Sequence, residues 1–100
     1  MRDYIPQAKE PYNFEDKIKI DDILEKTIVI HRFFIQHKNF QGNEYDAVTF
    51  EFSHDGNENK FTSQTSSGVL LTQFIREEKE GLPFRTRIVK IKNYYTMSEP

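Results

Sequence analysis

The stretch YDAVTFEFSHDGNENKFTSQT, residues 45–65, decides the fold. Its first nine residues alternate between apolar and polar side chains, which is the period of a strand with one buried face. Asp55-Gly56 follows, and this dipeptide is typical of tight hairpin turns. The stretch therefore predicts two antiparallel strands, over residues 45–53 and 60–65.

Upstream of this hairpin, the segment TIVIHRFFIQHK, residues 27–38, is rich in β-branched and aromatic side chains and contains neither Gly nor Pro. This composition predicts a long strand. Apolar residues occupy both alternating sets of its positions, as expected of a strongly bent strand that serves two parts of a core. The segment 39–44 around Gly42 is interpreted as a turn, and a short helical turn is expected around residues 16–25.

Downstream, GVLLTQFIREEKEG, residues 68–81, spaces its apolar side chains as one face of a helix, which Gly81 and Pro83 end. The segment FRTRIVKIKNYYTM, residues 84–97, predicts a last strand whose alternation slips. A β-bulge at Ile88–Val89 would repair the slip. With that bulge, four cations project from one face of the strand: Arg85, Arg87, Lys90 and Lys92.

The composition indicates one small folded domain. The chain has 100 residues, and 14% of them are aromatic although its mean hydropathy is -0.76. A disordered chain of this polarity would be poor in aromatic side chains. We expect an N-terminal arm over residues 1–20, one domain over 21–97 and a short tail over 98–100. The predicted core comprises Ile28, Ile30, Val48, Phe50, Phe52, Leu71, Phe74, Ile88 and Ile91.

Two absences narrow the function classes. The chain has no cysteine, which excludes disulfides, thiolate nucleophiles and Cys-based metal sites. It also has no apolar run near the ~18 residues that span a bilayer, and no apolar N-terminal stretch of the signal-peptide type. We therefore expect a cytoplasmic protein that makes no membrane contact.

The predicted order of elements is three strands, a helix and a returning strand. This is the order of the OB-fold, a small, partly open antiparallel barrel, here with its helix between strands three and four. The fold class is mainly β (α+β). A full OB-fold has a fifth strand, and either the part of residues 84–97 beyond the bulge or the N-terminal arm would supply it.

The order is accompanied by a family resemblance, carried by the segments DDILEKTIVIHRFFI, YDAVTFEF, GVLLTQFI and LPFRTRIVKIKNYYTM. Over residues 20–97 the chain resembles small single-stranded-DNA-binding-type proteins of phages and mobile elements of Gram-positive bacteria. The resemblance implies sequence-independent binding of single-stranded DNA in replication or recombination within a bacterial host cell. It implies single-stranded DNA as the partner and no cofactor.

The last strand carries the first candidate site. Although the net charge is -2, the final eighteen residues hold four cations (Arg85, Arg87, Lys90 and Lys92) against Glu99 alone. Tyr94 and Tyr95 follow them. Cations neutralise phosphates and aromatic rings stack on any base, a combination typical of single-strand binding. The alternative is a solvated strand face whose charges prevent edge aggregation.

A second candidate site comprises Lys38, Phe40 and Tyr45 around the first hairpin loop, where OB-folds often bind a strand. The alternative for Phe40 is that it folds back to cap the end of the barrel. Lys60, which opens the third strand, completes the set of candidate nucleic-acid-binding residues. Glu51 is expected on the outward face of the second strand, where it would repel phosphate.

No catalytic or metal-binding arrangement emerges, and we expect a protein that is not an enzyme. Nucleophile-elbow, Walker, dinucleotide-binding and HExxH motifs are all absent. His31 and His37 lie six residues apart, roughly 20 Å along an extended strand, which is too far to share a metal. His54 begins a turn, and all three histidines are expected to be structural or solvated.

The alternative function is a protein-interaction module, a phage-type inhibitor or adaptor that binds a host protein through an acidic surface. Glu77, Glu78 and Glu80 on the predicted helix would supply that surface. A homodimer is a further expectation, because two copies of so small a domain would follow a strand better than one.

Overall fold

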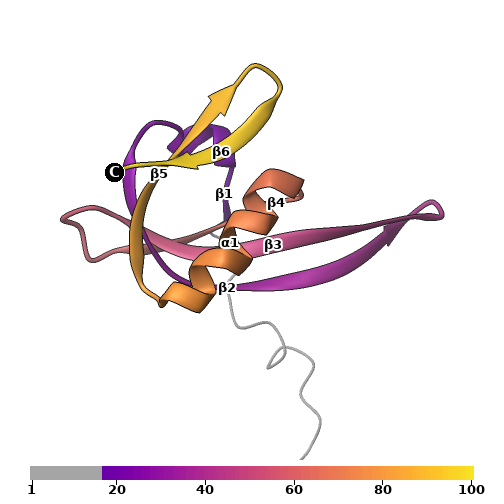
Figure 1. The fold of residues 1–100 in the computed structure, drawn as a ribbon, viewed down its shortest axis with the longest axis horizontal. Helices are drawn as coiled ribbons and strands as arrows, with labels where there is room; N and C mark the ends of the chain where they lie inside the picture. Colours follow the sequence, from indigo (N-terminus) through magenta and orange to yellow (C-terminus); the bar gives the residue numbers. More distant parts are fainter. Residues whose placement is uncertain (1–16) are drawn as a thin grey trace, which may run out of the picture.

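A computed structural model of the chain describes residues 17–100, which Figure 1 draws in colour. This part of the chain is mainly β, with six strands in one curled sheet and one α-helix. In chain order the elements are β1 (Lys17–Ile18), the 3₁₀-helix η3 (Ile20–Ile23), β2 (Thr27–Phe40), β3 (Asn43–His54), β4 (Lys60–Thr65), α1 (Gly68–Glu80), β5 (Phe84–Ile91) and β6 (Tyr94–Ser98).

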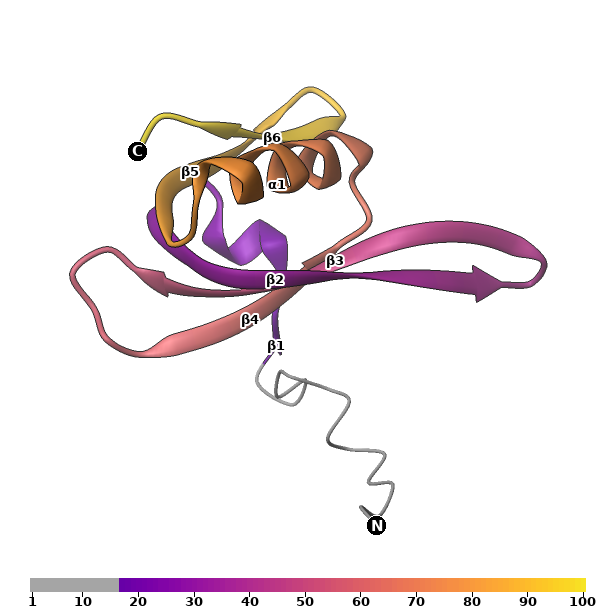
Figure 2. The same ribbon diagram turned by 60° about the horizontal axis from the view of Figure 1, so that its bottom comes forward.

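The strands are ordered β1-β4-β3-β2-β5-β6 across the sheet. The predicted hairpin is confirmed, because β3 and β4 pair antiparallel from Val48–Thr65 to Ser53–Lys60. The helix follows β4 in the chain, as predicted, and Figure 2 shows it lying against one face of the curled sheet. The β1–β4 pairing is parallel and joins Lys17 to Thr62.

The predicted bulge at Ile88–Val89 is wrong. β5 pairs with β6 in an unbroken register from Arg87–Ser98 to Ile91–Tyr94. The chain turns back at Lys92 and Asn93, so residues 84–98 form two strands joined by a tight turn. Val89 and Ile91 lie on the outward set of β5 positions, where Ile91 is 44% exposed, so the slip in alternation reflects apolar side chains on the outer positions and not a bulge.

The irregularity in register that the structure does contain lies in β2, between Ile30 and Arg32. On one side of it, Ile30 pairs with Phe52, and on the other side Phe33 pairs with Phe50. The extra residue, His31, moves the inward positions of β2 from the even-numbered Ile28 and Ile30 to the odd-numbered Phe33 and Ile35, whereas Val29 and Phe34 lie on the other face. A β-bulge bends the strand that contains it, so it accounts both for the change of alternating set and for the predicted bend.

Seven of the nine predicted core residues are fully buried: Ile28, Ile30, Val48, Phe50, Phe52, Phe74 and Ile88. The rings of Phe50 and Phe74 lie 5.1 Å apart between centroids. Two predictions are wrong, since Leu71 is only partly buried and Ile91 is 44% exposed. Leu70 is buried in place of Leu71 because it lies one helical turn before Phe74 on the same face of the helix. Ile91 is exposed because it falls on the outward set of β5 positions.

The domain begins earlier than the predicted boundary at residue 21. Lys17 and Ile18 already belong to the sheet, and Ile23 of η3 is buried in the core. The backbone N–H of Glu25 then donates to the carbonyl of Ile88 at 2.8 Å. Residues 1–16 of the predicted arm lie outside the described residues. No helix within residues 17–100 is long and apolar enough to cross a membrane.

Candidate nucleic-acid interface

The most prominent surface feature is a two-stranded arm. β3 pairs with β4 only as far as Val48–Thr65, and β2 pairs with β5 only as far as Ile30–Phe84. Beyond both limits β2 and β3 pair only with each other, and residues 36–47 are here called the arm. Figures 1 and 2 show it projecting past α1. It turns at Gln41 and Gly42, whose φ angles of 52° and 83° fit a two-residue hairpin turn.

The face of the arm that continues the side of the sheet turned away from the core is here called the outer face. It carries the second group of predicted site residues. Cross-strand pairs place Phe40 opposite Asn43 and Lys38 opposite Tyr45. Side chains of directly opposed residues project on the same face, and alternate pairs share that face. Phe40, Lys38 and Tyr45 are therefore brought together. Phe40 is 62% exposed, so the alternative that it caps the barrel end is wrong, and Tyr45 is 42% exposed.

The carboxylates of the arm lie on its opposite, inner face. His37 pairs with Asp46, and its Nδ1 lies 2.8 Å from Oδ1 of that residue. Glu44 belongs to the same alternating set, and its Oε2 lies 3.7 Å from Nε2 of His37. The arm is consequently two-faced. Its outer face presents two aromatic rings and a lysine without a carboxylate, whereas its inner face presents two carboxylates.

The outer face continues from the arm onto the barrel through Gln64 of β4. The side-chain amide of Gln64 donates to Oγ1 of Thr49 at 3.2 Å and to Oε1 of Gln36 at 3.4 Å. Its carbonyl oxygen accepts from Nζ of Lys17 at 3.1 Å. One side chain thus links β1, β2, β3 and β4 across the sheet.

Two shallow hollows meet at Gln64. One is lined by Lys38, Tyr45 and Ala47, and the other by Lys17 and Lys19. Between them Ala47 is 3% exposed and Thr49 is fully buried, so these two side chains contribute little to the surface there, where the half-buried side chain of Gln64 donates to the Thr49 hydroxyl. The surface from Phe40 to Lys19 is here called the track.

Glu51 lies on the outer face, as predicted, but it is paired. Nη2 of Arg32 lies 3.3 Å from Oε2 of Glu51, whose side chain is only 16% exposed. The exposed guanidinium therefore covers the carboxylate and reduces its repulsion of phosphate. Lys60 pairs with Ser53 at the first position of β4, and its side chain projects on the same face as Glu51. It lies farther from the arm than Glu51 does.

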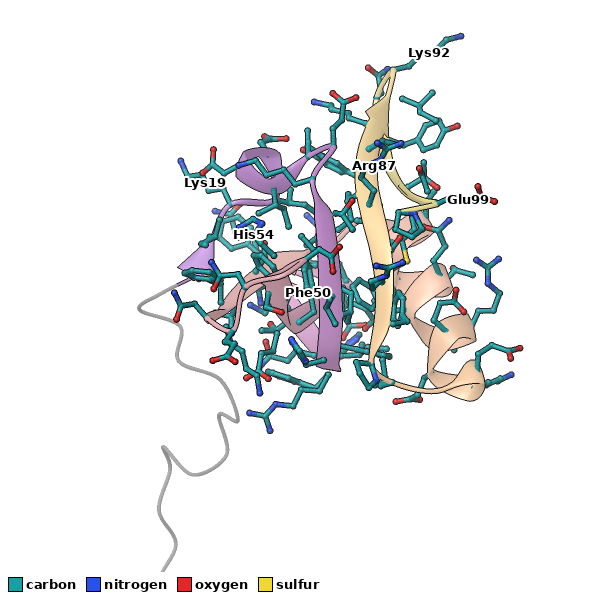
Figure 3. The ribbon with its side chains drawn as sticks, turned by 90° about the vertical axis from the view of Figure 1, so that its left-hand side faces the viewer. Lys19, Phe50, His54, Arg87, Lys92 and Glu99 are labelled. Carbon is teal, nitrogen blue, oxygen red and sulfur yellow. The ribbon has the colours of Figure 1, made fainter. Side chains whose placement is uncertain are left out.

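The first candidate site, on the last strand, is not assembled on one face. Arg85 and Arg87 share one alternating set of β5 and Lys90 belongs to the other, because the predicted bulge is absent. Lys92 occupies the turn, and Figure 3 shows it at the far end of the β5–β6 hairpin from Arg87. Nη1 of Arg85 lies 3.5 Å from Oδ2 of Asp55.

The two tyrosines of that hairpin are separated in the same way. Tyr94 is 45% exposed beside Ile91 on the outward set of positions. Tyr95 belongs to the other set, and its hydroxyl donates to Oδ1 of Asp21 at 2.7 Å. This hydrogen bond, with smaller contributions from burial and from the charge of Asp21, raises the pKa of Tyr95 above its ordinary value. Nζ of Lys90 lies 5.5 Å from the centre of the Tyr95 ring.

Three residues of the track, Lys17, Lys19 and Gln64, are not among the site residues predicted from the sequence. Lys17 and Lys19 were assigned to the N-terminal arm, although the alternation Lys-Ile-Lys-Ile at 17–20 is a strand signal. Gln64 gave no signal, because a glutamine on a strand is ordinary and its partners are distant in sequence. No group of three or more metal-ligating side chains arranged to hold an ion occurs in the described part of the chain.

The chain belongs to the family DUF8468, a domain of unknown function, whose model matches residues 15–98. Comparison with curated proteins and with solved structures finds no match in either. The matched residues include every helix and strand from β1 to β6, so the arm and the track are parts of the family domain.

Proposed function

We propose that the protein binds single-stranded DNA without sequence preference along the track. The observation that carries the proposal is the two-faced arm, which places Phe40, Tyr45 and Lys38 together and the carboxylates on the other side. Rings that stack on bases beside cations that neutralise phosphates are what single-strand binding requires. A role in the replication or recombination of a phage or mobile element in a bacterial cytoplasm is part of this proposal.

The strand pairing supports an OB-type barrel. If β2 is numbered as the first strand of the barrel, then β3, β4, β5 and β6 are its second, third, fourth and fifth strands. The first strand then pairs with the second and the fourth, the second pairs with the third, and the fourth pairs with the fifth. In this scheme β6 supplies the fifth strand, and β1 is an addition beside the third. OB-folds bind oligonucleotides on the face of strands two and three and on the adjoining first loop. Here that region is the outer face of β3 and β4 together with the arm.

The hydrogen bonds of Gln64 support indifference to base identity. Sequence is read by donors and acceptors aimed at base edges. Both amide hydrogens of Gln64 are directed to Thr49 and Gln36, and its carbonyl accepts from Lys17. The centre of the track is therefore occupied with internal hydrogen bonds, whereas the exposed rings stack on any base.

The charges predict the dependence of binding on salt. Lys17, Lys19 and Lys38 line the track of a protein whose net charge is -2. Contact with about three phosphates gives a slope of log affinity against log salt near −2, at ~0.7 per phosphate for single strands. Stacking on Tyr45 and Phe40 adds roughly 1–3 kcal/mol per base and is less sensitive to salt.

Fluorescence anisotropy with labelled oligo-dT tests the proposal in one titration series at several salt concentrations. Tyr45→Ala should weaken binding roughly tenfold with an unchanged salt slope, because it removes stacking. Lys38→Gln should reduce the slope by about 0.7, because it removes one phosphate contact. The matched controls Tyr94→Ala and Lys92→Gln, on the β5–β6 hairpin, should bind as the parent does. Absence of binding at low salt, or equal binding of duplex DNA, contradicts the proposal.

A second candidate function is the protein-interaction module, which the outer surface of α1 favours. Glu78 and Glu80 are exposed on α1, and Ile75, which is 41% exposed, lies one helical turn before Glu78. Charge reversal at both glutamates distinguishes the two functions. A DNA-binding protein should keep or gain affinity for oligo-dT when these carboxylates become lysines, whereas a module that uses this surface should lose its protein partner.

A further inference from the structure

The track ends at an exposed aromatic ring. Outward residues of β2 recur every second position, so Gln36, Lys38 and Phe40 follow one another at steps of about 7 Å. Only the turn residues Gln41 and Gly42 lie beyond Phe40. With 62% of its surface exposed, Phe40 is the most exposed large apolar side chain within residues 17–100. A nucleic-acid strand leaving the track in this direction would pass the ring last.

The inner face of the arm restricts what can lie beyond the ring. Glu44 and Asp46 are exposed on that face, with side-chain exposures of 65% and 47%. Phosphates of a duplex wrapped around the arm would approach these carboxylates and be repelled. The turn itself contains no charged side chain, because Gln41 and Gly42 are neutral. A duplex can therefore approach the arm end-on more favourably than from the inner side.

We infer that Phe40 stacks on the terminal base pair of a duplex whose single-stranded extension lies in the track. The preferred substrate is then a junction between single-stranded and double-stranded DNA. This inference rests on the proposed function, because the single strand must first occupy the track. A terminal base pair offers the ring a larger aromatic surface than one unstacked base, and no strand has to bend around the acidic face.

The test compares four DNA substrates in fluorescence anisotropy: oligo-dT alone, a blunt hairpin, and the hairpin carrying the same oligo-dT at its 5′ or its 3′ end. The parent protein should bind one of the two tailed hairpins several-fold more tightly than oligo-dT. Phe40→Ala should remove most of this several-fold preference, because it should weaken binding to the junction several-fold more than binding to oligo-dT. The control Tyr45→Ala should weaken oligo-dT and junction binding by the same factor and leave their ratio unchanged.

A spectroscopic readout separates stacking from a general loss of affinity. A 2-aminopurine placed in the terminal base pair should change its fluorescence when the parent protein binds, but not when saturating Phe40→Ala protein binds. Equal affinity of the parent for oligo-dT and both junctions overturns the inference while the proposed function stands. A junction preference that survives in Phe40→Ala also overturns it. Failure of the parent to bind any tailed or single-stranded substrate overturns both.

Discussion

The hydroxyl of Tyr95 in β6 donates a hydrogen bond of 2.7 Å to the carboxylate of Asp21 in η3, across 74 residues of sequence. Together with the bond from the Glu25 N–H to the Ile88 carbonyl, it ties the segment that follows β1 to the β5–β6 hairpin. β1 and β6 are the two edge strands of the sheet. The opening between these edges is therefore bridged by η3 and its hydrogen bonds, as Figure 2 lets the reader follow.

This relationship predicts alkaline sensitivity. The pKa of Tyr95 is raised in the folded state, first by the hydrogen bond to Asp21 and then by burial and the carboxylate charge. A folded pKa above the unfolded value means that the stabilisation is complete below the ordinary tyrosine value near pH 10, and is lost as the pH rises through the folded pKa. Urea unfolding at neutral and alkaline pH should show this loss in the parent.

Tyr95→Phe is the matched variant for that measurement. It should lower the free energy of unfolding at neutral pH by about 0.5–1 kcal/mol, the value of one hydrogen bond near the surface. Its stability should fall less steeply above pH 10 than that of the parent. An ultraviolet titration of the phenols should also lose its most alkaline component. Identical alkaline profiles for the two proteins would contradict a raised pKa of Tyr95 in the folded state.

Truncation of Phe50 should be strongly destabilising. It is fully buried, and its ring lies 5.7 Å from that of Phe52 and 5.1 Å from that of Phe74. Phe50→Ala should lower the free energy of unfolding by roughly 3–5 kcal/mol, because it removes buried apolar surface and leaves a cavity. Thermal unfolding followed by circular dichroism measures the loss. A melting temperature within a degree or two of the parent would contradict the packing described here.

Two serines should respond to alanine in opposite directions. Oγ of Ser63 is buried without a hydrogen-bond partner, whereas Oγ of Ser53 lies 2.8 Å from Nε2 of His31. Ser63→Ala should leave stability unchanged or raise it by up to about 1 kcal/mol, since an unsatisfied buried hydroxyl is costly. Ser53→Ala should lower it by about 1 kcal/mol. Chemical unfolding of both variants checks the order, and the reverse order would contradict this assignment of partners.

Lys92 occupies a strained position in the β5–β6 turn. Its φ angle is 55°, a region that side chains with a Cβ rarely adopt and that glycine adopts freely. Lys92→Gly should raise the free energy of unfolding by about 0.5–1 kcal/mol. Lys92→Ala removes the same charge but keeps the Cβ, so it should bring no such gain. If both variants are equally stable in urea unfolding, backbone strain at this turn is not the cause.

Several elements could be predicted from the sequence because their signals are local. Alternation over residues 45–53 and the Asp55-Gly56 turn define the β3–β4 hairpin, and the same alternation places Val48, Phe50 and Phe52 in the core. The helix is defined by apolar spacing that ends at Gly81. Each of these depends on contacts within a few residues, where backbone sterics and side-chain period are sufficient.

The candidate site was predictable only in part. Lys38, Phe40 and Tyr45 were grouped because a short loop brings them close in sequence, and the register of β2 and β3 then places them on one face. The four cations of residues 84–97 are grouped by an assumed bulge, and they separate because β5 continues without one, which places Lys90 on the other face from Arg85 and Arg87, and because Lys92 lies in the turn. A one-residue difference in register moves a side chain to the opposite face, and the alternation of a single strand does not fix it.

The sequence by itself determined a small β-rich domain with a Phe-rich core, a central hairpin and one helix, because hydrophobic period and turn chemistry are properties of neighbouring residues. Tertiary structure alone decided that β1 borders β4, that Gln64 connects four strands, and that Asp21 meets Tyr95. These contacts join residues 15 to 74 positions apart. Local alternation and turn chemistry do not specify such contacts, because each of them depends on the packing of segments that are distant in sequence and carries the entropy cost of bringing those segments together.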